Sequence, residues 1–130
     1  MFEAWTLKRK AIAQQEETLR DSIRLLSDCN RVEYYKFYKL ECKDPDTYAV
    51  LNWLFLAGLH HFYLGKKVRG TLNLILLFVG VGSIASQPTV GLLLIISLLL
   101  AELPALFRSQ IIVAHHNIGI GNSIKARLRQ

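Results

Sequence analysis

The chain has 130 residues, which is enough for one ordinary domain and too few for two. Its charge is unevenly distributed: residues 1–46 hold nine basic and nine acidic side chains, whereas residues 47–130 hold seven basic side chains and a single acid, Glu102. This division excludes a soluble domain of even composition. It also weakens a nucleic-acid-binding interpretation of the net charge of +6, because the excess charge lies between and after hydrophobic runs.

The first 44 residues contain neither glycine nor proline, and this absence predicts one or two long helices. Apolar side chains recur there every seven residues, at Trp5, Ile12, Leu19 and Leu26. The companion heptad positions are polar, so the apolar stripe is narrow. We expect residues 1–44 to form a polar amphipathic extension that docks on another helix or on a membrane domain, with a coiled-coil dimer as the alternative.

Residues 31–43 interleave tyrosines and a phenylalanine with lysines, a composition typical of the membrane interface and, less specifically, of base stacking. The sequence Asp44-Pro45-Asp46 then marks a boundary, because proline disfavours a helix before it and suits the first turn of a new one. Either Asp44 or Asp46 is expected to cap that helix.

Three hydrophobic runs follow, at about 47–64, 71–86 and 90–107. At 1.5 Å per residue, runs of 16–18 residues span roughly 24–27 Å, slightly less than a hydrocarbon core of ~30 Å. Residues 71–107 hold one charge and show no polar helical face, which a soluble protein of this size has no means of burying. The sequence predicts an all-α integral membrane protein, with a membrane domain at 45–108 and a basic tail at 109–130. Two and three spans both remain open.

The most specific string in the chain is GLHHFYLG, followed closely by basic residues and a further glycine. It resembles the signature of the TM-two domain family, also called NINE proteins, over residues 47–108. The matching positions are Gly58, His60, Phe62, Tyr63, Leu64, Gly65 and Gly70, and Glu102 stands where that family usually has aspartate.

The resemblance implies a non-enzymatic membrane module that anchors or regulates a partner. Animal relatives usually carry signal peptides and none is evident here, so we expect a multi-pass protein of the bacterial inner membrane. Its expected partners are the lipid bilayer and other membrane proteins or a second copy of itself, and no nucleic acid. The alternative is an oligomeric pore, since short spans with a basic tail resemble a phage holin in outline.

Four polar side chains interrupt the hydrophobic runs: Asn52, His60, Asn73 and Glu102. A polar or ionisable group in lipid is costly and needs a partner. We expect His60 and Glu102 to hydrogen-bond, which makes a buried clip between helices or, alternatively, a proton or ion site.

Enzymatic and metal-binding signals are weak. The chain has no HExxH and no CxxC motif, and no nucleophile-elbow serine. Its two histidine pairs, His60-His61 and His115-His116, are sequence neighbours that diverge by about 100° on a helix, so neither pair is expected to chelate from one face. Cys29 and Cys42 are expected to be reduced thiols, with a disulfide as the alternative if their segment is exported. The sequence therefore predicts no catalytic residue, no cofactor and no metal.

Overall fold

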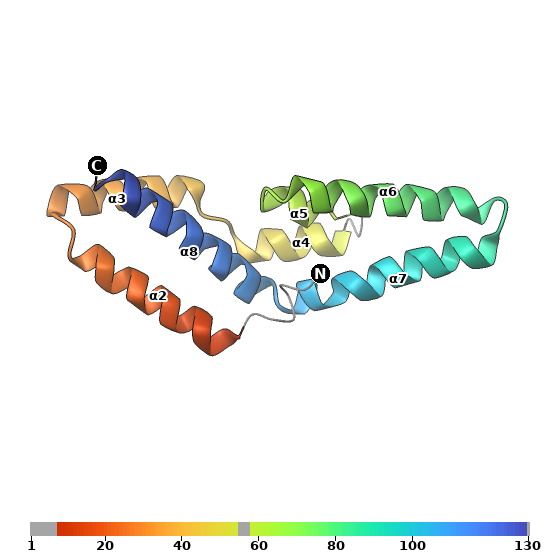
Figure 1. The fold of residues 1–130 in the computed structure, drawn as a ribbon, viewed down its shortest axis with the longest axis horizontal. Coiled ribbons are helices and arrows are strands. Elements are labelled where there is room, and N and C mark those ends of the chain that lie inside the picture. The colour runs from red at the N-terminus through yellow and green to blue at the C-terminus, as the bar shows by residue number, and fades with distance from the viewer. Residues whose placement is uncertain (1–7, 55–57, 130) are drawn as a thin grey trace.

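A computed structural model describes residues 8–54 and 58–129. Over these residues the fold is all-α, with no strand. Figure 1 shows an elongated molecule in which one helical hairpin extends to one end and three other helices gather at the opposite end. In chain order the helices are α2 (Arg9–Arg24), α3 (Asp28–Glu41), α4 (Pro45–Leu54), α5 (Leu59–Tyr63), α6 (Lys67–Ile84), α7 (Pro88–Phe107) and α8 (Ser109–Arg127).

The polar end of the molecule is built from α2, α3 and α8. Two residues of the predicted stripe, Ile12 and Leu19, are buried on α2 together with Ile23. Helix α8 packs on this face and contributes Ile118 and Ile124 to the same apolar cluster. The narrow stripe thus docks on another helix of the same chain, which agrees with the expectation that the N-terminal extension docks on a helix. Trp5, the first position of the stripe, lies outside the described residues.

The residues predicted as a basic tail form helix α8 and have partners on the N-terminal helices. The Arg127 guanidinium lies 2.7 Å from Glu41 of α3, and Lys125 Nζ donates to the Ser22 hydroxyl of α2 at 2.9 Å. The structure here differs from the expectation of a separate extension and tail, because residues 109–127 supply the apolar face that the N-terminal helices need.

The aromatic segment on α3 is divided between core and surface. Tyr34 is 1% exposed and stacks on Tyr38, whereas Tyr35 is 55% exposed and Phe37 is 36% exposed. Burial raises the pKa of Tyr34 to about 12. Of these aromatic side chains, only the outward-facing ones, such as Tyr35 and Phe37, are available for the predicted role at a membrane interface.

The predicted boundary after α3 is a capped helix start. Asp44 Oδ2 accepts hydrogen bonds from the Thr47 backbone N–H at 2.6 Å and from the Thr47 hydroxyl at 2.8 Å, and Pro45 is the first residue of α4. These hydrogen bonds lower the pKa of Asp44 below its ordinary value. Of the two aspartates that the sequence offered, Asp44 is the cap.

The first hydrophobic run, 47–64, is not one continuous helix. It contains α4, which ends at Leu54, and the five-residue α5, which begins after Gly58. Gly58 has a φ of +83°, a left-handed conformation that an α-helix does not continue through. Residues 55–57 of this run lie outside the described residues.

The other two runs form a hairpin, α6 and α7, close to the predicted bounds of 71–86 and 90–107. Gly80 and Gly91 face each other near the turn of the hairpin, and a Cβ on Gly91 would lie 2.6 Å from the Gly80 carbonyl oxygen. Pro88 occupies the first turn of α7, where its missing N–H costs no helical hydrogen bond. Within the described residues, α6 and α7 are the helices long and apolar enough to cross a membrane.

Gly121 allows α8 to approach the N-terminal helices, and this contact is testable. A Cβ there would lie 2.5 Å from Tyr34 Oη and 2.7 Å from Leu19 Cδ2, whereas nothing lies within 4 Å of a Cβ on Gly119. We expect Gly121→Leu to lower the free energy of unfolding by about 1–3 kcal/mol through overpacking. The matched variant Gly119→Leu should have no such cost, as chemical unfolding in detergent monitored by circular dichroism will show. Equal stability of the two variants would contradict this packing.

Candidate functional site

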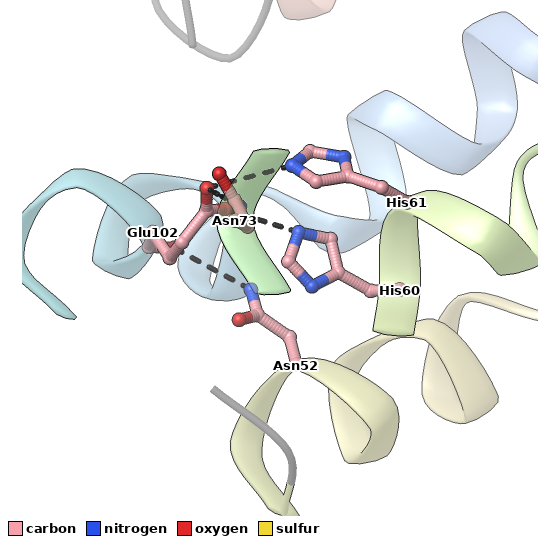
Figure 2. A network of polar contacts seen from close by, with 5 residues as sticks. All are labelled: Asn52, His60, His61, Asn73 and Glu102. Carbon is pink, nitrogen blue, oxygen red and sulfur yellow. Dashed lines mark hydrogen bonds and ion pairs between the residues drawn. The ribbon is translucent and has the colours of Figure 1, made fainter. Parts of the chain in front are cut away.

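Polar side chains from three consecutive helices converge on Glu102 of the next helix, α7. Asn52 comes from α4, Asn73 from α6, and both His60 and His61 from α5, as Figure 2 shows. The four residues predicted to interrupt the hydrophobic runs therefore lie together, and His61 joins them. The exposed fraction of the side chain is 0% for His60, 10% for His61 and 7% for Glu102.

Each oxygen of the Glu102 carboxylate faces one histidine ring. His60 Nε2 lies 3.0 Å from Oε2, and His61 Nε2 lies 3.4 Å from Oε1. The two imidazole rings lie with their centroids 4.1 Å apart and their planes inclined by 44°. Adjacent residues can converge in this way because they approach different oxygens of one carboxylate from the same short helix.

Two asparagines position the same glutamate. Asn73 Nδ2 donates to Glu102 Oε1 at 2.7 Å, and Asn52 Nδ2 donates to the Glu102 backbone carbonyl at 3.4 Å. The carbonyl that accepts from Asn52 belongs to the turn of α7 in which Pro104 lies two residues further on. Glu102 is thus held through both its side chain and its backbone.

His60 is the most enclosed of these residues. Its ring packs edge-on against Tyr48, with the centroids 5.1 Å apart. Although Nε2 lies close to Glu102, neither ring nitrogen makes a hydrogen bond of good geometry. The expected contact between His60 and Glu102 is therefore present, but without a directed hydrogen bond. His60 belongs to α5 and not to the two apolar hairpin helices. Burial lowers the pKa of His60 and so favours the neutral ring, whereas the neighbouring Glu102 acts to raise this pKa.

The other motif residues hold α5 against its neighbours. The Phe62 ring lies against Gly70, where a Cβ would be 2.5 Å from a ring carbon, and Leu64 belongs to the apolar cluster shared with α8. The Tyr63 hydroxyl accepts the backbone N–H of Asp44 at 2.9 Å. Gly65, just after the end of this helix, has a φ of +72°, a left-handed conformation that glycine adopts without strain. The motif therefore encodes the placement of α5 in the fold.

Two residues of this region were missed by sequence reasoning. One is His61, whose convergence with His60 depends on the position of Glu102 and is not visible in the sequence. Asn117 of α8 was not singled out, yet its amide accepts the backbone N–H of Lys43 and donates to the carbonyl of the same residue, both at 2.8 Å. This reciprocal pair fastens the linker before α4 to α8.

The arrangement has two chemical capacities. It joins α5, α6 and α7 through one buried carboxylate, and it gathers two imidazole nitrogens and a carboxylate oxygen whose positions all lie within 4.8 Å of one another. Comparison of the chain with protein-family models, with curated proteins and with solved structures gives no match.

The left-handed glycines on either side of α5 allow a matched test of this packing. A Cβ on Gly58 would lie 2.8 Å from Asn73 Cβ, whereas nothing lies within 4 Å of one on Gly65. Gly65→Ala should cost about 1–2 kcal/mol for left-handed strain alone. Gly58→Ala should cost more, because it also displaces Asn73 from Glu102. The free energies of unfolding in detergent measure both effects, and equal losses would show that the Gly58–Asn73 approach is unimportant.

Proposed function

We propose that the protein is a small, non-enzymatic integral membrane protein of the TM-two domain type, whose α6–α7 hairpin crosses the bilayer. Its role is to anchor or regulate a partner at a membrane, which we take to be the bacterial inner membrane. The expectation of a membrane module rests on the FYLG-containing motif. The observation that carries the proposal is the exposed apolar surface of the hairpin.

The hairpin buries little of its apolar surface within the chain. The apolar windows of α6 and α7 have mean hydropathies of 1.4 and 2.4, and only 11% and 22% of their residues are buried. Phe78 is 67% exposed and Leu93 is 62% exposed. A contiguous apolar surface along two whole helices is unfavourable in water and favourable in hydrocarbon. Figure 1 shows that no other helix covers the outer part of the hairpin.

Two spans also give a consistent orientation. They place the basic residues at the base of the hairpin, Lys66, Lys67, Arg69 and Arg108, on the same side as α2, α3 and α8. The turn at the tip, residues 85–87, has no charged side chain. The positive-inside rule therefore assigns the base and the polar helices to the cytoplasm. Three spans would instead place α8 and the N-terminal helices on opposite sides of the membrane, although α8 packs on α2 and α3.

Membrane insertion is tested by a lysine on the outer face of the hairpin. Phe78 lies near the middle of α6, and a lysine at the centre of a span costs roughly 2.5–3.5 kcal/mol of insertion. We expect the wild type to resist alkaline carbonate extraction and Phe78→Lys to be partly extracted. Val32→Lys is the control, because Val32 is 71% exposed on α3, outside the hairpin. Complete release of the wild type by carbonate would refute the proposal, and permeabilisation of liposomes by it would favour the pore.

The orientation is tested with cysteines. Cys29 is exposed on α3, and Ser86→Cys places a second thiol at the tip of the hairpin. In a Cys42→Ser background, a membrane-impermeant maleimide added to intact cells should label Cys29 only after permeabilisation and should label the Ser86→Cys variant before it. Labelling of Cys29 in intact cells would show the opposite orientation or a third span.

A further inference from the structure

We propose that His60, His61 and Glu102 form a binding site for a divalent transition-metal ion of the zinc type. Each residue offers a ligand atom, and the three atoms lie within 4.8 Å of one another, so one ion can reach all of them with small side-chain adjustments. All three side chains are buried, which separates this cluster from the loose groups of acids common on protein surfaces. The three side chains lie together whether or not the hairpin crosses a bilayer.

The state of His60 points to a ligand. Its side chain is 0% exposed, and its Nε2 faces Glu102 without a hydrogen bond. A buried imidazole nitrogen without a hydrogen bond costs free energy. Both ring nitrogens of His60 are in this state, and coordination of a metal by Nε2 removes the cost for that nitrogen while leaving Nδ1 as it is. In this arrangement Nδ1 carries the ring proton, which is the neutral tautomer that metals bind.

The donor set selects the kind of ion. Two imidazole nitrogens and one carboxylate are ligands that zinc takes in proteins, with a further position left for water or another ligand. Mg²⁺ and Ca²⁺ prefer sets made of oxygen alone, so they suit this site poorly. The charges also suit a cation, because an ion of charge +2 would lie beside the negative carboxylate of Glu102. Among the described residues, the side-chain partners of that carboxylate are two imidazoles and an amide.

The surroundings of the cluster hold the carboxylate in place. Asn73 donates to Oε1 of Glu102, and that oxygen keeps a second lone pair for a metal. Hydrogen-bonded ligand carboxylates of this kind are a regular feature of metal sites. A bound ion would tie α5 directly to α7, and through Asn73 to α6. The neighbouring position of the two histidines, which argued against chelation on an ideal helix, is compatible with it here because both Nε2 atoms face the Glu102 carboxylate (Figure 2).

The test uses the full chain without a histidine tag, in detergent, after removal of metals with a chelator. Isothermal titration with Zn²⁺ should show one equivalent bound, and Mg²⁺ should show none. We expect Glu102→Gln and His61→Gln to weaken Zn²⁺ binding by at least about 100-fold. The matched controls are His115→Gln and His116→Gln, which change the second adjacent histidine pair of the chain and should leave the affinity unchanged.

Absence of Zn²⁺ binding by the wild type overturns the site, as does an equal loss of affinity in the α8 controls or no loss in the cluster variants. Helicity by circular dichroism shows whether each variant folds. X-ray absorption at the zinc edge of the wild type decides the matter even if the variants do not fold. Two imidazoles with Zn–N distances of about 2.0–2.1 Å and no sulfur are expected, and a sulfur ligand would place the ion at the cysteines instead.

Discussion

The buried carboxylate of Glu102 is the constraint on which the centre of the molecule depends. A carboxylate removed from water is costly unless its oxygens have partners, and this is the one acid after residue 46. The chain supplies those partners from α5 and α6, while Asn52 of α4 donates to the backbone carbonyl of the same glutamate. The break at Gly58, the shortness of α5 and the contact between Gly70 and Phe62 all serve to bring the histidines and asparagines to this point.

Helix α8 connects this centre to the polar end. It follows α7 after Arg108 alone, and its first turns contribute Ile112 and Val113 to the cluster that also holds Tyr48 and Leu64. Its later turns cover α2 and α3 through Ile118 and Ile124. One helix thus serves two apolar clusters, which explains why it has no single apolar face. The basic residues at its end are accommodated by the acidic and hydroxyl groups of the N-terminal helices.

Local rules could predict the parts of the structure that local interactions determine. The lengths of α6 and α7 follow from unbroken apolar runs, the start of α4 follows from Asp44 and Pro45, and the left-handed turn follows from Gly65. The contact of His60 with Glu102 was predicted because each needs a polar partner in an apolar setting. The docking of α8 on the N-terminal helices was not predicted, because its contacts join residues about 100 positions apart in the sequence. The role of His61 was missed for the same reason, because it depends on where α7 places a carboxylate.

The proposed topology, in which the first hydrophobic run does not span the bilayer, also gives a reason for the apolar character of that run. Asn73 and Glu102 lie about one to two turns from the base of the hairpin, so their cluster falls near the edge of the hydrocarbon layer. Polar groups at that depth need a cover against lipid, and α4 and α5 provide it. Helix α4 is 10 residues long, and its outer face carries Val50 and Trp53, which are 51% and 67% exposed. In the proposed topology its apolar surface would face lipid at the level of the interface, where a tryptophan ring is favoured, while Asn52 on the same helix turns inward to Glu102.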